Sequence, residues 1–560
     1  MLRRRFFGTL LISALVFPTA ALAQSAKANQ TAPLSNEKVY TAPDDVIAKI
    51  RDEGLNKSKI METLSYLTDV IGPRLTNSPN MKRANEWTRD TMMKWGMQNA
   101  KLEPWGPFGR GWSLRGYHAS VVEPQNISLI GFPKAWSTST KGTVSAEVVY
   151  FNPKDEAELE TFKGKLAGKI VLVADIREQK ADFGGMGTRR KDEDLKKMAD
   201  WTPQPAGQGG GQGGRNFGAG QAFNAKRWNL LLSEGVAVVV DSSSKGSGGT
   251  VFVSGAAAVP NIPVEGTPTA PVRVYDKTSE SRIIPQLTIS IEDANRLIRM
   301  MKGGIKPKMS VNIDAQFHDD DLMGYNTVAE IPGTDPKLKD EVVMVGAHLD
   351  SWHSAGGATD NAAGSAVAME AARILLAAGL KPRRTIRVAL WSGEEQGLNG
   401  SREYVKQQFG EMKGGAAFGP PNPNAPKPEL IKGANYDKLS VYYNLDNGTG
   451  KIRGVYMQGN DAVRPYFQAW LTPFNDLGAK WLTLQNTGGT DHLSFDRIGL
   501  PGFQFIQDEI EYSTRTHHSN QDNYDRIQAD DMKQAATVMA AFVYQSAMMD
   551  EKMPRKSLVP

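Results

Sequence analysis

Apolar residues recur at helical spacing in the N-terminal part of the chain, from Asp44 to about Lys101. The clearest series, at intervals of three and four residues, is Ile60, Leu64, Leu67 and Ile71. This spacing places side chains on one face of a helix, where they can meet a common core. A second run from Met81 to Met97 has the same character. The pattern predicts helices over this region.

Residues 120–310 contain short runs of β-branched and aromatic side chains instead. The candidate strands are 147–151, 169–173 and 236–240, the last preceded by a helical run over 225–234. Residues 203–221 form a glycine-rich, low-complexity stretch inside this region. Such a composition cannot build a packed core, so it predicts an excursion from an otherwise β-rich fold.

Strand and helix patterns alternate from about residue 320 onward. The candidate strands are 341–347, 385–391, 439–445 and 502–506. The candidate helices are 361–378, which is rich in alanine, and 530–549, near the end of the chain. Alternation of this kind is typical of α/β proteins. We therefore predict an α/β fold built on a largely parallel sheet.

The composition is that of a globular protein of two or three domains. The chain has 560 residues, of which 40% are hydrophobic and 23% are charged, enough for a sizeable core. The formal net charge is +5, and three of these positive charges belong to Arg3, Arg4 and Arg5. The net charge without them is +2, which is too small to indicate a nucleic-acid-binding protein. Cysteine is absent, so stability must come from the core and from any bound metal.

The first 23 residues have the pattern of a signal peptide. A basic head precedes an apolar stretch, and Ala21-Leu22-Ala23 has the small residues of a cleavage site. A membrane anchor is the alternative, but the apolar run is shorter than the ~20 residues that a span needs. Cleavage would release an exported protein, periplasmic or secreted, with a flexible lead-in over 24–43 and no later membrane segment. Residues 3–7 resemble a twin-arginine signal only loosely, which leaves the export route open.

Histidine and acidic residues follow three of the predicted strands, where ligands of open α/β sheets bind. They are His348 and Asp350 after the first strand, Glu394 and Glu395 after the second, and Asp446 after the third. Five of the seven histidines lie between His348 and His518, and His517 and His518 share a polar loop. Each feature alone is more often structural or a solvated surface pair. Their repetition at matching strand ends indicates a metal site.

The mixture of imidazole and carboxylate groups suits two divalent cations that lie close together. Zinc accepts both ligand types, and a catalytic site keeps a position for water. Two cations about 3.5–4 Å apart share a bridging ligand. Asp360 suits that role, since it stands at a loop-to-helix junction between the strand ends. In the pair Glu394–Glu395, one carboxylate can bind metal while its neighbour accepts a proton from metal-bound water, whose pKa falls towards ~7.

Four motifs resemble those of di-zinc exopeptidases of the bacterial leucyl aminopeptidase, aminopeptidase Y and plasma glutamate carboxypeptidase type: HLDSW…GATDNAAG, WSGEEQGLNGS, NLDNGTG and THHSNQD. The resemblance is strong over 320–550 and implies the zinc-peptidase fold, a mostly parallel mixed sheet sandwiched by helices. It implies a discontinuous catalytic domain, 44–119 and 311–556, with a protease-associated domain inserted at 120–310. The glycine-rich excursion has no counterpart in that pattern.

The resemblance also implies a role for each site residue. The implied metal ligands are His348 and Asp446 for one zinc ion, Glu395 and His518 for the other, and Asp360 as the bridge. Glu394 would be the general base and later the acid, and Asp350 would orient His348 through its other ring nitrogen. Asp491 would do the same for His518. His518 is chosen over His517 because Ser519 and Asp522 follow it, as in the family pattern.

His353 departs from that pattern, because the plasma carboxypeptidase branch tends to carry an acidic residue at its position. We interpret it as a surface residue of its loop, with a substrate contact as the alternative.

The predicted function is a zinc-dependent exopeptidase acting near a free N-terminus, as an aminopeptidase or dipeptidase. Two Zn²⁺ per chain are expected, with Co²⁺ or Mn²⁺ as substitutes, and peptides as substrates. The oligomeric state stays open. The alternatives are a carboxypeptidase-type dipeptidase, a single-zinc cyclase-like transferase and a non-catalytic receptor-like relative. Serine hydrolases and HExxH metalloproteases are disfavoured because the chain has neither Gly-x-Ser-x-Gly nor HExxH.

Overall fold

The computed structural model describes residues 39–203, 217–262, 272–414 and 428–557. The predicted signal peptide, 1–23, and most of the predicted lead-in lie outside the described residues, as does the central part of the glycine-rich excursion. The end of that excursion differs from the prediction, because helix α6 (Phe217–Ser233) already begins there. Among the described residues, no helix has the length and apolar character needed to cross a membrane.

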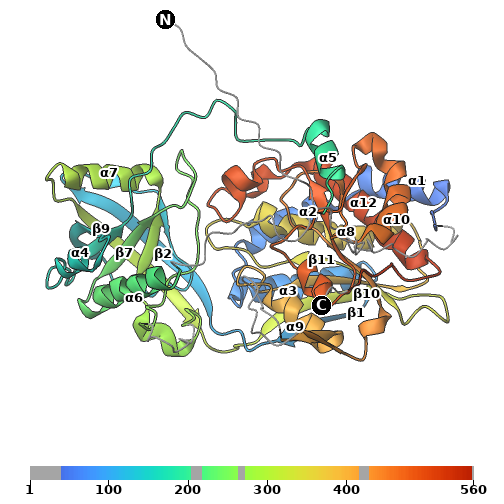
Figure 1. The fold of residues 1–560 in the computed structure, drawn as a ribbon, viewed down its shortest axis with the longest axis horizontal. Helices are drawn as coiled ribbons and strands as arrows, with labels where there is room; N and C mark the ends of the chain where they lie inside the picture. The colour runs from blue at the N-terminus through green and yellow to red at the C-terminus, as the bar shows by residue number, and fades with distance from the viewer. Residues whose placement is uncertain (1–38, 204–216, 263–271, 415–427, 558–560) are drawn as a thin grey trace, which may run out of the picture. The chain divides into compact units, whose positions relative to one another are not determined.

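A mixed eight-stranded sheet organises the larger part of the molecule (Figure 1). In spatial order its strands are β1 (Gln98–Trp105), β10 (Gly324–Ile331), β12 (Thr385–Trp391), β11 (Val342–His348), β15 (Leu439–Asn444), β18 (Gly502–Gln507), β16 (Ile452–Tyr456) and β17 (Trp481–Thr483). The four central strands, β12, β11, β15 and β18, run parallel to one another. Their flanking strands β10 and β16 pair antiparallel to them. The α/β fold with a mixed sheet is therefore confirmed.

Helices cover both faces of this sheet, and the central strands supply side chains to both. Val343 and Val345 of β11 join the core beneath α8 (Ala363–Ala377) and α12 (Ala529–Met548). Val342 and Met344 join the opposite core, with α9 (Asn399–Gln408) and α11 (His492–Asp496). Successive side chains of a strand point to opposite faces, so a strand buried on both sides is apolar throughout. This explains the continuous hydrophobic run of β11.

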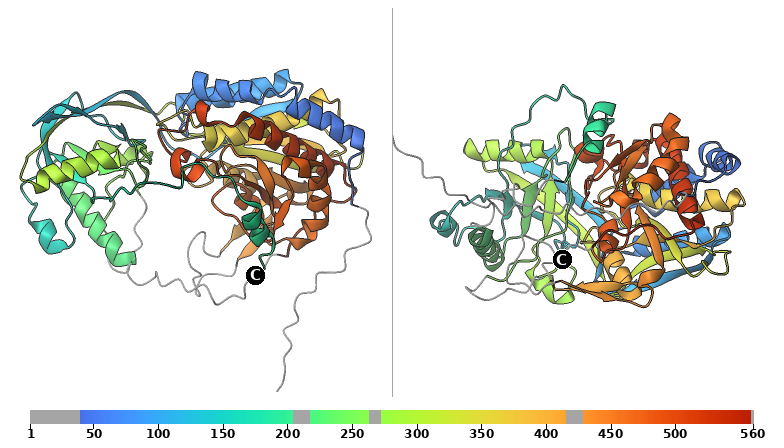
Figure 2. Two further views of the ribbon diagram at one scale, coloured as in Figure 1. Left: turned by 90° about the horizontal axis from the view of Figure 1, so that it is seen from above. Right: turned by 45° about the vertical axis from the view of Figure 1, so that its right-hand side comes forward.

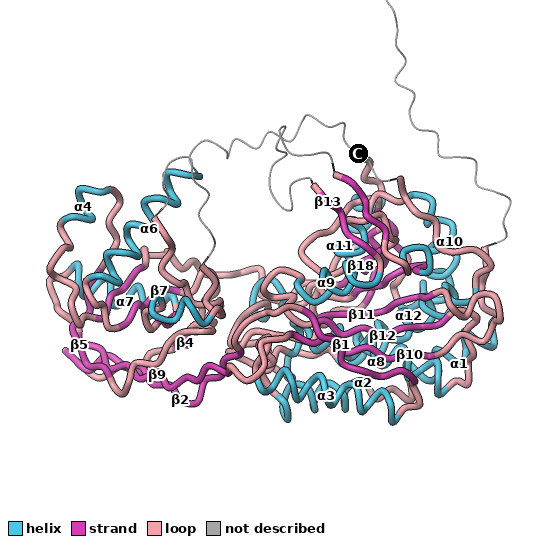
Figure 3. The backbone as a smooth tube through the Cα atoms, turned by 90° about the horizontal axis from the view of Figure 1, so that it is seen from below, coloured by secondary structure: helices cyan, strands magenta, loops and turns pink. Residues whose placement is uncertain are grey.

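The N-terminal helices add to the α8 and α12 side of the sheet (Figure 3). They are α1 (Asp44–Leu55), α2 (Ile60–Ser65), which continues as a π-helical turn to Ile71, and α3 (Pro79–Lys94). Helix α3 begins where Ser78 accepts a hydrogen bond from the Met81 amide, a typical N-cap. The predicted helical region was too long at its C-terminal end, because β1 begins at Gln98.

A second eight-stranded sheet is formed between residues 111 and 318, which we call the insert. In spatial order its strands are β3 (Ile127–Ser128), β2 (Gly111–Glu123), β9 (Lys308–His318), β5 (Val144–Tyr150), β6 (Ile170–Val173), β7 (Val238–Ser242), β8 (Gln286–Ile289) and β4 (Gly131–Pro133). The two long strands β2 and β9 pair from Gly111 opposite His318 to Glu123 opposite Lys308. The sheet therefore extends past the predicted limits of 120 and 310 at both ends.

Part of the insert leaves its own sheet and packs on the first one (Figures 1 and 2). This strap, residues 186–201, includes α5 (Asp192–Ala199), which lies against β17. Thr188 and Ile510 exchange two backbone hydrogen bonds of 2.8 Å. Asp192 also forms an ion pair of 2.8 Å with Arg453. The hydrophobic pattern of the sequence did not reveal this crossing, since Leu195 is the one buried apolar side chain of the strap and its other contacts described here are polar.

Candidate metal centre

Three parallel strands bring the predicted residues to one edge of the first sheet. His348 is the last residue of β11, Glu394 and Glu395 lie in the turn that follows β12, and Asp446 comes two residues after β15. The carboxyl ends of parallel strands meet at the same edge, which is where open α/β sheets bind their ligands. Asp360 comes to the same place from the loop before α8.

His348 faces two carboxylates at distances that suit a shared metal ion. Its Nε2 atom lies 3.4 Å from Asp360 Oδ1 and 3.5 Å from Asp446 Oδ1. A tetrahedral ion with ligand distances of about 2.0–2.2 Å holds its ligand atoms about 3.3–3.6 Å apart. All three side chains are at least nine-tenths buried. These residues can therefore hold one ion.

A second group forms on the other oxygen of Asp360. Asp360 Oδ2 lies 3.2 Å from His518 Nε2, and His518 Nε2 lies 2.9 Å from Glu395 Oε2. His517 is more distant, with its Nε2 atom 3.9 Å from Asp360 Oδ2. The structure therefore brings together all five predicted ligands. Asp360 lies between His348 and His518.

The chemistry of the donor atoms fits cations at this cluster. Asp360 Oδ2 and Glu395 Oε1 are buried and have no hydrogen-bond partner among the described residues. Burial raises the pKa of Glu395 well above its usual range, and the neighbouring Asp360 carboxylate raises it further. Buried carboxylates that repel one another need a positive charge nearby, and a divalent cation supplies it. Zinc, which binds imidazole nitrogen and carboxylate oxygen, matches this donor set.

Asp522 holds the loop that carries Asp360, a function that the sequence analysis missed. Its two carboxylate oxygens accept hydrogen bonds from the Thr359 amide, at 2.7 Å, and the Asp360 amide, at 3.1 Å. Burial raises the pKa of Asp522 to about 7. In the sequence, Asp522 served only to choose His518 over His517. Its role as a support for Asp360 depends on a contact between residues far apart in the chain.

Asp350 differs from the prediction in how it supports the site. The Nδ1 atom of His348 lies 3.0 Å from the backbone carbonyl oxygen of Asp350, whereas the nearest carboxylate oxygen is 3.6 Å away. The carboxylate instead accepts hydrogen bonds from the amides of Glu394 and Glu395, at 3.3 and 3.2 Å, and from the Thr76 hydroxyl at 2.9 Å. Asp350 therefore positions the glutamate pair with its side chain and His348 with its main chain.

Arg74 is a buried cation behind the cluster that the sequence analysis did not identify. Its guanidinium donates to five backbone carbonyls, those of Leu67, Gly72, Leu349, Gly356 and Gly357. Burial lowers its pKa to about 10, against the opposing effect of nearby carboxylates such as Asp522. Arg74 thereby fixes the backbone on both sides of the 349–357 loop. The sequence around it, GPRLTNS, has no pattern that signals this role.

Two other expectations need correction. Asp491 was expected to orient His518, but no hydrogen bond joins the two among the described residues, and burial raises the pKa of Asp491 to about 7. His353 was interpreted as a surface residue, yet its Nε2 atom lies 2.6 Å from the Pro133 carbonyl oxygen. Its ring also meets Trp112 edge-on. His353 therefore joins its loop to the insert.

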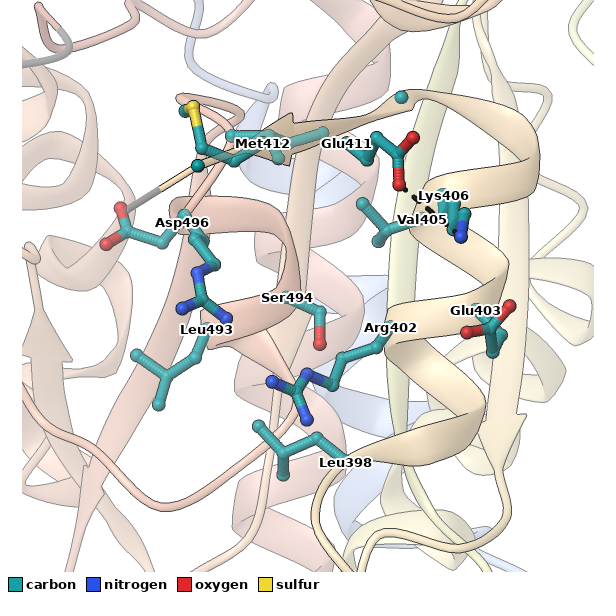
Figure 4. A pocket seen from close by; sticks show the side chains of 14 residues that line it. Leu398, Arg402, Glu403, Val405, Lys406, Glu411, Met412, Leu493, Ser494 and Asp496 are labelled. Carbon is teal, nitrogen blue, oxygen red and sulfur yellow. Dashed lines mark ion pairs between the residues drawn. The ribbon is translucent and has the colours of Figure 1, made fainter. Parts of the chain in front are cut away.

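A pocket of about 460 Å³ lies apart from the metal ligands (Figure 4). It is lined by α9, β13 (Gly410–Lys413) and α11, with Leu398, Arg402 and Ser494 among its side chains. None of the five predicted ligands lines it. The donor set at the strand ends, and not the size of a hollow, therefore marks the candidate site.

Comparison with known proteins agrees with this donor set. Residues 326–543, which include all five predicted ligands, match the peptidase family M28. This region of the chain, residues 326–543, belongs to peptidase family M28. As a member of this family it is a metallo-exopeptidase, a hydrolase, and the family implies zinc as the metal. The non-catalytic alternative is thereby set aside.

Relatives extend over most of this M28 peptidase. Carboxypeptidase Q of Bos taurus is 26% identical over 505 residues, which are 90% of this chain and 88% of that protein. Among solved structures, an M28 peptidase precursor from Shewanella amazonensis covers 92% of this chain and 98% of its own, with 22% identity and a TM-score of 0.60. The zinc aminopeptidase of Bacillus subtilis covers 88% and 96%, with 18% identity and a TM-score of 0.52. These structures show that the fold is shared.

Proposed function

We propose that this M28 peptidase is a two-zinc aminopeptidase or dipeptidase that hydrolyses peptide bonds near a free N-terminus. The proposed ligands are His348 and Asp446 for one ion, Glu395 and His518 for the other, and Asp360 as the bridge. The observation that carries the proposal is the position of Asp360. Its Oδ1 atom lies beside His348 and its Oδ2 atom beside His518, so one carboxylate serves two donor groups.

Glu394 is the proposed general base. Its Oε2 atom lies 4.0 Å from His348 Nε2, at the edge of the cluster, while its neighbour Glu395 faces His518. Burial raises the pKa of Glu394 well above its usual range, and a cation bound nearby would lower it again and keep the carboxylate ionised, ready to accept a proton. The hydrogen bond from its amide to Asp350 fixes the turn that presents it.

The reaction is the hydrolysis of an amide bond. Bound zinc would supply Lewis acidity and lower the pKa of a water molecule. Glu394 takes a proton from the attacking water as the oxygen bonds to the carbonyl carbon. The bond between that carbon and the nitrogen then breaks, and Glu394 returns the proton to the leaving amine.

Charge at the site favours a substrate with a free amine. The carboxylates of Asp360, Glu394, Glu395 and Asp446 converge there. Two bound zinc ions would offset this charge, so an ammonium group would be attracted by the carboxylate oxygens that the metal leaves free, whereas a terminal carboxylate needs a cation to receive it. Arg74 lies behind the cluster, and its guanidinium is committed to backbone carbonyls.

A carboxypeptidase-type dipeptidase is the second candidate. The observation in its favour is the similarity to carboxypeptidase Q over 90% of the chain, which includes the insert. In that case the acidic cluster would serve metal binding alone, and the selection of the carboxylate would lie with residues outside the cluster.

One set of peptides distinguishes the two candidates. A dipeptide and a tripeptide with both ends free are compared with their N-acetylated and C-amidated forms, each with and without a zinc chelator. We expect chelator-sensitive cleavage of the free and amidated forms only. Cleavage of the free and acetylated forms only would establish the carboxypeptidase. Cleavage that resists the chelator would contradict both.

We also propose that the protein is exported and that the segment before Gln24 is removed. The support is the pattern of a basic head, an apolar stretch and Ala21-Leu22-Ala23. N-terminal sequencing of protein secreted by an expressing bacterium tests this. A mature N-terminus at Gln24 is expected, and an intact Met1 on the exported protein would contradict it.

A further inference from the structure

The loop that carries His517 and His518 connects β18 to α12 and lies against the insert. Both sides of the contact are described, and the bonds across it are mostly between backbone groups. This is unlike the other proposed ligands, which stand at or beside the ends of central strands of the first sheet, or in the loop before α8.

A short antiparallel pairing joins the insert to the histidine loop. The Val253 amide donates to the His518 carbonyl at 2.8 Å, and the Asn520 amide donates to the Val251 carbonyl at 3.1 Å. Between them, Phe252 pairs with Ser519 as an antiparallel bridge. Residues 251–253 of the insert are buried, so this pairing is shielded from water.

The side chain of Asn520 extends this pairing by two bonds. Its Oδ1 atom accepts from the Val251 amide at 2.8 Å, and its Nδ2 atom donates to the Gly249 carbonyl at 3.2 Å. An asparagine amide offers a donor and an acceptor, as a peptide group does, so it completes a ladder that the loop backbone could not extend. All of these contacts lie within two residues of His518.

His518 needs such support because of its backbone conformation. Its φ angle is +59°, in the left-handed region that residues with a Cβ atom disfavour. The ring is also supported from the insert, because it meets Trp352 edge-on with centroids 5.8 Å apart, and Trp352 meets Trp136 at 6.5 Å. A loop free in solution would therefore not hold His518 in this position.

The insert contacts the same loop on the N-terminal side of His518 as well. Lys245 donates to the Ser513 carbonyl at 2.9 Å. The strap contributes the paired amides and carbonyls of Thr188 and Ile510. The insert therefore contacts the loop on both sides of His517 and His518.

We propose that the insert positions His518 for its metal ion, with Asn520 as the positioning residue of this contact. The metal site of Glu395 and His518 then depends on the insert, whereas His348 and Asp446 stand at the strand ends of the first sheet and do not touch the contact made by Asn520. This inference rests on the ligand assignment of the proposed function. It adds that one part of a two-metal centre is assembled by a segment 267 residues away in the sequence, counted from Phe252 to Ser519.

The experiment measures zinc binding to the metal-free full-length protein by titration calorimetry. The parent is compared with Asn520→Ala, Asn520→Asp and the matched control Asn229→Ala. Asn229 is also half-buried, and its side chain also makes two hydrogen bonds to backbone groups, as a donor to the carbonyls of Ala225 and Pro260, but both lie within the insert. Asn520→Asp keeps the acceptor for the Val251 amide and loses the donor to Gly249.

We expect the parent and Asn229→Ala to bind two zinc ions alike. In Asn520→Ala one site should keep its affinity and the other should weaken about 10- to 100-fold, as loss of an outer partner of a metal ligand does. Asn520→Asp should lie between them. Excess zinc should restore the turnover number of Asn520→Ala, which a misfolded protein would not allow.

Hydrogen exchange in the metal-free proteins gives a second reading, with faster exchange of residues 508–523 expected in Asn520→Ala only. Two zinc ions bound by Asn520→Ala as tightly as by the parent would overturn the inference and leave the proposed function intact. A parent that binds fewer than two zinc ions would instead contradict the proposed function.

Discussion

The two halves of the proposed metal centre are built in different ways. His348 and Asp446 stand at the ends of neighbouring parallel strands, β11 and β15, whose backbones are bonded to each other from Val342 to Gly346. His518 stands in a long loop with a left-handed backbone and is held by residues 249–253 of the insert. One half is therefore rigid by secondary structure, and the other depends on tertiary contacts.

The two halves therefore differ in the kind of unfolding that would displace their ligands. A ligand on a central strand moves only when the sheet opens, which requires global unfolding. A ligand on a loop can move when a few hydrogen bonds break. Asp360 belongs to both halves, so its support by Asp522 connects the two.

The largest effect is expected from Asp360→Ala, which removes the residue common to both halves. Both zinc affinities should fall by more than the about 100-fold that loss of an outer partner costs. Activity at micromolar zinc should then be undetectable. Zinc content after dialysis, measured by atomic absorption, checks this. Retention of two tightly bound ions would show that Asp360 is not the bridge.

The adjacent glutamates should separate chemistry from binding. Glu394→Gln should lower the turnover number about 10²- to 10⁴-fold, the usual contribution of a general base, while both zinc ions stay bound. Glu395→Gln should weaken the zinc ion on the His518 side and leave the His348 side unchanged. Steady-state kinetics and zinc titration of both variants provide the test. A near-parental turnover number in Glu394→Gln would show that Glu394 is not the general base.

A smaller effect is expected from Asp522→Ala, which frees the amides of Thr359 and Asp360. Both zinc affinities should weaken together, about 10- to 100-fold, because the bridge itself is displaced. Calorimetry should show this paired loss, in contrast to the single-site loss expected for Asn520→Ala. Asp525→Ala, at an exposed position three residues later, is the control. A loss confined to one ion would mean that Asp360 does not serve both.

The smallest effect concerns His353, at the contact between its loop and the insert. Burial lowers its pKa to about 4. In the unfolded chain the pKa of this imidazole is about 6.5. Between about pH 6.5 and the folded value, the unfolded chain therefore binds one more proton than the folded protein. The free energy of unfolding then falls as the pH is lowered, by at most about 1.4 kcal/mol per pH unit. Urea unfolding at pH 7 and pH 5 should show a smaller drop for His353→Gln than for the parent. Equal drops would contradict this account.

The strand ends could be predicted because their signals are local. The apolar runs of β11, β12 and β15 are buried on both faces, and the residues that follow them are histidine and carboxylates. The edge strand β1 was missed, because a half-exposed strand lacks a continuous apolar run. The strap was missed for a related reason, since Asp192 and Thr188 make polar contacts that leave no hydrophobic pattern.

By itself, the sequence determined the α/β class of the catalytic part, the group of candidate ligands and their order along the chain. Residue type and strand periodicity carry that information, because each acts over a few neighbouring positions. Only the tertiary structure decided which groups support those ligands. Arg74, Asp522 and Asn520 act on residues far from them in sequence, through backbone groups that every residue possesses. Contacts of that kind depend on where the folded chain passes, and a single sequence does not display them.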